Sequence, residues 1–293
     1  MLELKSLLMA SFLLMWGYFL TPISIKLSGR FGILDQPSPR KGHSQPVPRG
    51  AGLVVWMGYL LWSLLFVPDG REFAFLATGA SMVFFVGYLD DMSPLKPKIR
   101  LFVHLLAASL VVIPLHLSPL LSLVYLLWIA GCTNAYNLID GMNGLSLSMA
   151  MLALFAVGCA DGSLNLILPL IALCLGILPW NFPKAHTFLG DGGVYLLGFV
   201  VSTMMMWSVE PSMSPNVVKI AVTLILLGGV PVADTLTTIV RRLIAGKSPF
   251  SPDRGHVHHR LLDRGFSEGK VLVILIFAQG FLLWCGFSIS LST

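Results

Sequence analysis

The chain carries an acidic pair, Asp90-Asp91, directly after an uncharged apolar run at 73–89. Two adjacent carboxylates raise the pKa of one of them unless a cation holds both ionised. A helix dipole disfavours acids at a helix C-terminus, so a merely solvated helix end explains the pair poorly. The pair therefore indicates either a metal-associated site or a base that takes a proton from a phosphate.

A second polar segment, NAYNLIDGMNG at 134–144, follows another apolar run. If the preceding helix continues, Asn134, Asn137 and Asp140 recur every three residues and share one face. Amides and a carboxylate suit a hard cation such as Mg²⁺, which keeps waters or phosphate oxygens as its other ligands, and they also suit a ribose and base. An Asn/Gly-rich turn is the alternative, and the glycines fit it.

Two further segments hold polar groups of the kind that bind anions. In TFLGDGG, at 187–193, Asp191 could cap a helix, or the glycines could let a phosphate approach the backbone. The segment 254–260 holds three His and two Arg. Zinc is disfavoured there because no second cluster of Cys or acids completes a tetrahedral set. Donors to a diphosphate or a sugar are favoured.

The first polar link, at 23–49, fits two interpretations. Its charged residues lie among prolines and suit either substrate binding or contact with anionic lipid; they include Asp35, Arg40, Lys41, His43 and Arg49. Asp234 lies inside an apolar run, where an unpaired charge would cost about 3 kcal/mol. We expect Asp234 to cap or pair locally and leave it out of the site.

These segments are connected by long apolar runs. Of 293 residues 56% are hydrophobic and 11% charged, against about 25% charged in soluble domains. Run length, and the lack of alternation that a barrel needs, predict an all-α integral membrane protein. We expect one membrane domain, 1–293, with ten spans at about 3–22, 50–67, 73–89, 101–117, 119–133, 145–160, 163–180, 192–208, 217–237 and 271–291.

Ten spans put alternate links on opposite faces. Of the 19 Lys and Arg, 16 fall on the face that takes links 23–49, 90–100, 134–144, 181–191 and 238–270. The positive-inside rule makes this face cytoplasmic and places both termini outside. Every dense polar cluster lies on the same face. The net charge of +5 does not indicate nucleic acid, because most of the chain lies in lipid.

In this order, DDMSPLKPKIR, NAYNLIDGMNGL, FLGDGG and SPFSPDRGHVHHRL resemble the polyprenyl-phosphate N-acetylhexosamine-1-phosphate transferases, glycosyltransferase family 4. DQPSPRKGHSQPVPRGAG is similar to that family's first cytoplasmic loop, so the resemblance covers about residues 30–266. The last loop, SPFSPDR-x-H-x-HH, resembles the WecA-type branch. The related MraY branch carries consecutive histidines after a proline instead.

The resemblance implies a fold of ten or eleven helices with a cytoplasmic-face active site in the bacterial cytoplasmic (inner) membrane, often as a homodimer. It implies transfer of N-acetylhexosamine-1-phosphate, with UDP-GlcNAc the expected donor, from a UDP-sugar to undecaprenyl phosphate, with release of UMP. This step initiates a surface glycan such as an O-antigen or a cell-wall linkage lipid. The implied cofactor is Mg²⁺, or Mn²⁺ in its place.

The resemblance also implies roles for single residues. Asp90 would deprotonate or position the lipid phosphate, with Asp91 beside the metal, and Asp191 and Asn137 would be metal ligands. Asp140 completes the expected catalytic set, near the nucleoside. The expected substrate-binding residues are Lys98, Asn134, Asn143, Phe188 (stacked on uracil), Arg254, His256, His258, His259, Arg40 and His43. Many members carry Asp at the position of Asn143, so a catalytic role for Asn143 is not expected.

Two other functions stay open. The same chemistry could use another UDP-N-acetylhexosamine or UDP-MurNAc-pentapeptide as donor. A transporter or lipid flippase would also hold polar residues within its spans. A transporter, however, should carry such groups near mid-membrane and on both faces, whereas here they crowd one face. We expect a single displacement without a covalent aspartyl intermediate, since a metal and basic residues suffice.

Overall fold

The computed structural model describes residues 2–37, 45–65, 70–209, 216–248 and 255–291, and this part of the chain is almost entirely helical. Its strands are two residues each: β1 (Leu34–Asp35) pairs antiparallel with β2 (Val47–Pro48), Leu34 opposite Pro48. The helices are α1 (Leu2–Phe31), α2 (Ala51–Leu65), α3 (Arg71–Met92), α4 (Pro97–Val112), the 3₁₀ turn η1 (Ile113–Leu115), α5 (Pro119–Ile139), α6 (Leu145–Ala160), α7 (Leu164–Asn181), α8 (Gly190–Ser208), α9 (Val217–Leu227), α10 (Gly229–Ile244), α11 (Val257–Asp263) and α12 (Glu268–Leu291).

The all-helical prediction is confirmed, but the count of ten spans is not. Within the described residues six helices are long and apolar enough to cross a membrane: α1, α3, α4 with η1, α5, α7 and α12. A bent pair, α9 and α10, makes a seventh if it is one span. The apolar helices α2 and α6 have only 15 and 16 residues, below the roughly 20 that a hydrocarbon core requires.

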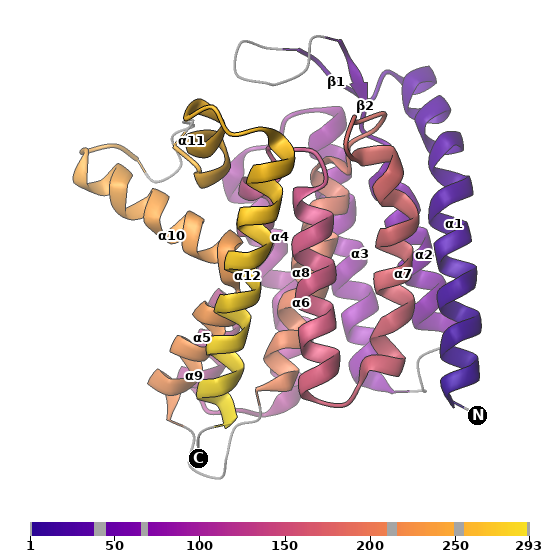
Figure 1. Ribbon diagram of the computed structural model, residues 1–293. Coiled ribbons are helices and arrows are strands. Elements are labelled where there is room, and N and C mark those ends of the chain that lie inside the picture. Colours follow the sequence, from indigo (N-terminus) through magenta and orange to yellow (C-terminus); the bar gives the residue numbers. More distant parts are fainter. Residues whose placement is uncertain (1, 38–44, 66–69, 210–215, 249–254, 292–293) are drawn as a thin grey trace.

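The predicted span 217–237 is broken where two glycines adjoin. α9 and α10 meet at an angle of 104°, and Gly229 has φ +60°, a conformation that favours glycine. The backbone amide freed by the break is satisfied by α12, because Val230 N donates to the buried Gln279 Oε1 at 2.7 Å. α10 therefore leaves the bundle at a steep angle (Figure 1).

Helix α8 lies at the centre of the bundle and is buried from Gly192 to Met206. It meets α3 and α2 through glycines, so that backbones touch. A Cβ on Gly87 would lie 2.5 Å from Gly192 N, and one on Gly52 would lie 2.7 Å from Gly193 N. Small residues at such crossings allow close helix packing within membranes. The register of α8 against both neighbours is therefore fixed by contacts that admit no side chain.

The polar links gather at one end of the bundle. The β strands and α11 lie at that end, whereas both chain termini lie at the other (Figure 1). The alternation of links across ten spans stays a prediction, because the described residues show six or seven helices that could cross a membrane. Which compartment the polar end faces stays a prediction.

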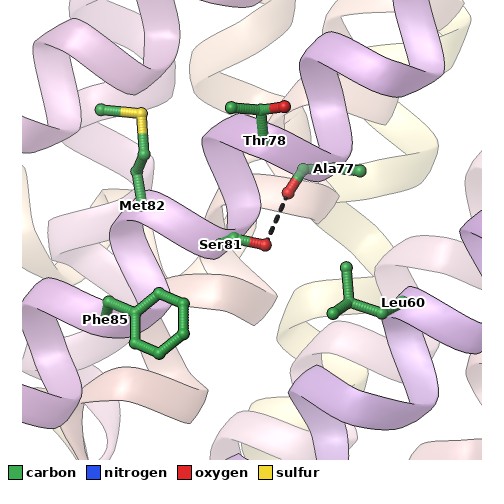
Figure 2. A pocket seen from close by; sticks show the side chains of 6 residues that line it. All are labelled: Leu60, Ala77, Thr78, Ser81, Met82 and Phe85. Carbon is green, nitrogen blue, oxygen red and sulfur yellow. Dashed lines mark hydrogen bonds between the residues drawn. The ribbon is translucent and has the colours of Figure 1, made fainter.

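A surface hollow lies between α2 and α3. It has a volume of about 470 Å³ and is lined by Leu60 of α2 and by Ala77, Thr78, Ser81, Met82 and Phe85 of α3. Figure 2 shows that its polar atoms are few, and Ser81 Oγ is already bonded to Ala77 O at 2.8 Å. With no charged group in its lining, this hollow is not the site of the chemistry.

Candidate active site

The side chain of Asp91 is only 2% exposed. Hydrogen bonds to both carboxylate oxygens compensate the cost of burying it. Its Oδ1 accepts from Arg49 Nη1 at 2.8 Å and from Asp191 N at 3.0 Å, and its Oδ2 accepts from Gly192 N at 3.3 Å. The two amides belong to the first turn of α8, where a helix attracts anions. The sequence predicts that a phosphate could bind the backbone amides at the start of α8. In the structure the carboxylate of Asp91 binds these amides instead.

Arg49 connects Asp91 to the first polar link. Its guanidinium also bonds to Asp35, through Nε at 3.1 Å and through Nη2. Burial disfavours the charged form of Arg49, but the carboxylates of Asp91 and Asp35 outweigh it, and the pKa of Arg49 is raised above its ordinary value. The sequence left Arg49 undecided between lipid contact and substrate binding; the structure instead places it between two buried acids.

Asp90 and Asp191 share a second arginine. Arg100 Nη1 lies 2.5 Å from Asp90 Oδ2 and 3.5 Å from Asp191 Oδ2, and the two carboxyl groups are within hydrogen-bonding reach of each other. Asp90 Oδ1 also accepts from Leu95 N at 2.5 Å. The Asp191 side chain is 24% exposed against 8% for Asp90, so Asp191 offers the more accessible carboxylate. Lys98, the expected phosphate-neutralising residue, is exposed in the first turn of α4.

Asp140 completes a group that we call the acidic cluster: Asp90, Asp91, Asp140 and Asp191. It follows the last residue of α5. Burial raises the pKa of Asp140 to about 6, and the charge of Asp91 raises it further. Asp140 therefore lies within the electrostatic field of Asp91.

The amides that precede Asp140 do not all face the same way. Asn137 is partly buried in the last turn of α5. Asn134 turns toward α4, where its Nδ2 lies 2.9 Å from Nδ1 of the buried His104. Asn143 bonds to Pro183 O at 3.1 Å and to Glu268 Oε2 at 3.3 Å. The shared face expected for Asn134, Asn137 and Asp140 is thus divided between a helix contact and the polar end.

Phe188 lies on a backbone connection between two links. Phe188 N donates to Pro48 O at 2.9 Å, and Ala51 N donates to Phe188 O at 3.2 Å. Thr187 Oγ1 adds a bond to Pro48 O at 2.9 Å. The expected uracil-stacking residue is therefore held next to β2, the strand that Arg49 directly follows.

The last loop, residues 255–260, which we call the histidine segment, reaches the acidic cluster from the side of α10. A Cβ on Gly141 would lie only 2.2 Å from His258 Nε2, so the His258 ring packs on the backbone next to Asp140. The ring centroids of His258 and His259 are 4.2 Å apart, and those of His256 and His258 are 6.0 Å apart. Three predicted substrate-binding residues, Arg40, His43 and Arg254, lie outside the described residues.

The expectation that Asp234 caps or pairs locally is only partly correct. Asp234 is paired, but its partner is His256, 22 residues further along the chain: His256 Nδ1 lies 2.6 Å from Asp234 Oδ2. Sequence reasoning thus left out two contributors to this end of the molecule, Arg100 and Asp234, and left the role of a third, Arg49, undecided.

The donor set can be tested against the implied cation. No group of three His, Cys, Asp or Glu side chains arranged to hold a metal occurs among the described residues. Mg²⁺ does not need one, because it binds through one or two carboxylates and takes substrate phosphates and waters as its other ligands. An accessible Asp191 beside Asp90 supplies carboxylates of that kind, so the residues fit Mg²⁺.

The apolar helices and the charged site at their ends describe a class of multi-pass membrane enzymes, and comparison with known proteins agrees. The model of glycosyl transferase family 4 matches residues 73–209. "Probable undecaprenyl-phosphate N-acetylglucosaminyl 1-phosphate transferase" of Bacillus subtilis is 34% identical, over 92% of this chain and 80% of that protein.

Two further relatives extend the comparison. The undecaprenyl-phosphate alpha-N-acetylglucosaminyl 1-phosphate transferase of Thermotoga maritima is 31% identical, over 89% of this chain and 83% of that protein. The decaprenyl-phosphate N-acetylglucosaminephosphotransferase of Mycolicibacterium smegmatis is 32% identical, over 92% of this chain and 77% of that protein. The chain belongs to this family of polyprenyl-phosphate sugar-1-phosphate transferases, in its WecA-type branch, as its motifs predict.

Proposed function

We propose that this protein transfers GlcNAc-1-phosphate from UDP-GlcNAc to undecaprenyl phosphate and releases UMP. The observation that carries the proposal is the pairing of Asp90 with Asp191 beneath Arg100, at the boundary between apolar helices and polar links. An acceptor anchored in lipid presents its phosphate at such a boundary. The names of the relatives support N-acetylglucosamine as the sugar, and they include both undecaprenyl and decaprenyl acceptors.

The reaction brings one anion to another, so catalysis depends on positioning and on neutralising charge. An oxygen of the lipid phosphate attacks the sugar-bearing phosphorus of the donor, and the bond from that phosphorus to the oxygen of UMP breaks. We assign Asp90 to position the lipid phosphate and to accept its proton. Arg100 already contacts both carboxylates and is available to neutralise the charge that accumulates between them.

Other residues bind and orient. Asp191 and Asn137 would hold Mg²⁺, or Mn²⁺, which when bound screens the negative charge of the diphosphate. Asp140 and Asn143 lie toward the nucleoside, and Phe188 stacks on the uracil. His256, His258 and His259, with Arg254, bind the sugar and diphosphate. Asp91 is the exception to the catalytic set expected from sequence, because its oxygens are taken by Arg49 and α8. We assign it a positioning role.

The setting follows from the charge pattern. We propose that the polar end faces the cytoplasm across a bacterial inner membrane, with both termini outside and ten spans in all. The bent pair α9 and α10 then counts as one span, α2, α6 and α8 are included as spans, and we expect a homodimer. The positive-inside rule supports the orientation, since 16 of the 19 Lys and Arg lie in the links of the polar end.

The test measures UMP release by the purified protein in detergent with undecaprenyl phosphate, Mg²⁺ and a panel of UDP-sugars. We expect metal-dependent release with UDP-GlcNAc and a loss on the order of 10³-fold in Asp191→Asn, comparable to removal of a central electrostatic group. Asp161→Asn is the matched control, because this exposed aspartate only accepts from Ser163 N at 2.9 Å. Folded protein that releases no UMP from any donor would overturn the proposal in favour of a transporter.

A further inference from the structure

Asp234 is a buried acid outside the acidic cluster. It lies in α10, one turn beyond the break that separates α10 from α9. Its side chain is 5% exposed. Its Oδ2 lies 2.6 Å from His256 Nδ1, and its Oδ1 accepts from Val257 N at 2.7 Å. Both oxygens are therefore used, and both partners belong to the histidine segment.

We propose that Asp234 is a positioning residue that fixes the ring of His256 and the start of α11, and thereby holds the histidine segment over the Asp140 loop. The role of that segment in binding the diphosphate rests on the proposed function. The geometry of the contact does not.

The backbone contact supplies a helix cap from another helix. Val257 is the first residue of α11, and the amides of a first turn have no partner inside their own helix. The N-cap residue, His256, makes no side-chain cap bond. Asp234 provides the missing acceptor, and its negative charge suits a helix N-terminus.

The side-chain contact determines the protonation of the imidazole. An ionised carboxylate only accepts hydrogen bonds, so Nδ1 of His256 carries a proton and Nε2 is the ring atom left to meet a ligand. The His256 ring stacks on that of His258 with an interplanar angle of 11°. His258 in turn packs on Gly141, beside Asp140. Loss of Asp234 would free both the orientation and the tautomer of His256.

A double-mutant cycle on UMP release tests whether Asp234 acts through His256. We expect Asp234→Asn and His256→Ala each to lower the rate about 10- to 100-fold, the range for losing a hydrogen bond to a charged group. The double variant should be no slower than the slower single variant, because both changes remove one shared interaction. Losses that multiply would overturn the proposal. Asp161→Asn, at an exposed aspartate remote from the segment, should change nothing alone or combined with His256→Ala.

A second measurement does not depend on activity. In protein with ¹⁵N-labelled histidine, the ring signals of His256 are assigned by their disappearance in His256→Ala. At a pH where the ring is neutral we expect a fixed Nδ1–H form in the wild type, and loss of that form in Asp234→Asn. Identical His256 signals in the two proteins would overturn the proposal, even if the chain proves not to be a transferase.

If Asp234→Asn does not fold, the variant Asp234→Glu is used to test the proposal. Glutamate keeps the acceptor charge, so the Nδ1–H form should survive with part of the activity. Its loss in folded Asp234→Glu protein would contradict the assignment.

Discussion

The acidic cluster and the histidine segment meet at the same end of the molecule but are held in different ways. The cluster is tied into α3 and α8 by backbone contacts between glycines, by two arginines and by amides of α8. The described part of the histidine segment contacts α10 through the carboxylate of Asp234 and through Arg241, whose guanidinium packs on Gly255, and it rests on the Asp140 loop through His258. We therefore expect substitutions around the acidic cluster to disrupt the whole site. Substitutions around the histidine segment should displace one binding surface only.

The largest effect should follow from Arg49→Lys. Lysine keeps the charge but lacks the fork that contacts Asp35 and Asp91 together. We expect UMP release to fall about 100-fold, since two hydrogen bonds between charged groups are weakened. Arg30→Lys, at an exposed arginine near the end of α1, should leave the rate unchanged. Equal rates for the two variants would show that the cluster does not act as a unit.

Next in size is the effect of packing on stability. Gly87→Ala would place a methyl group 2.5 Å from Gly192 N, and overpacking of this kind costs about 1–3 kcal/mol. We expect thermal unfolding in detergent several degrees below wild type. Gly131→Ala in α5 is the control: a Cβ there meets nothing within 4 Å, and alanine favours helix over glycine. Unchanged unfolding of Gly87→Ala would mean that α3 and α8 can separate at no cost.

A smaller effect should follow from a substitution where the histidine segment packs on the Asp140 loop. Gly141→Ala would put its methyl group 2.2 Å from His258 Nε2 and displace that ring. We expect a loss of about tenfold in activity, because a displaced binding group costs orientation, with thermal stability close to wild type. Gly269→Ala, where a Cβ meets nothing within 4 Å, is the matched control. A large drop in the unfolding temperature of Gly141→Ala would mean that the acidic cluster and the histidine segment are not held independently of each other.

The smallest effect concerns pH. The pKa of Asp140 is raised to about 6 in the folded chain, above the roughly 3.9 of an unfolded aspartate. The folded state therefore holds the proton longer, and stability from this group is lost as pH rises from about 4 to about 6, by at most about 1.4 kcal/mol per pH unit. Unfolding of wild type and Asp140→Asn in EDTA should diverge over this interval. Parallel curves would show that burial does not raise the pKa of Asp140 in the folded chain.

Part of this site could be predicted from sequence because its acids stand at the ends of apolar runs, where a charge is conspicuous. The cations that pair with them are not local. Arg100 is exceptional: Asp90 lies two residues before the end of α3 and Arg100 three residues after the start of α4, so the short link between these helices keeps the two side chains close together. No comparable signal connects Asp234 with His256, since their contact depends on the path of α10.

The helix count was harder to predict for a related reason. Hydropathy finds apolar runs but does not give their direction, and the run at 217–237 contains Gly228-Gly229, where the chain turns by 104°. The glycines and the following Pro231 signal a break, yet the acceptor for the backbone amide of Val230 is Gln279 of another helix, which the local sequence does not indicate.

The glycine contacts of α8 also bear on how the protein can move. Because backbone meets backbone at Gly87–Gly192 and at Gly52–Gly193, a slip of α8 by one residue would drive Val194 or Asp191 into the neighbouring main chain. Sliding of α8 along its own axis is therefore blocked in both directions. The spacing between the carboxylates of α3 and those of α8 is therefore expected to stay unchanged when other parts of the site move.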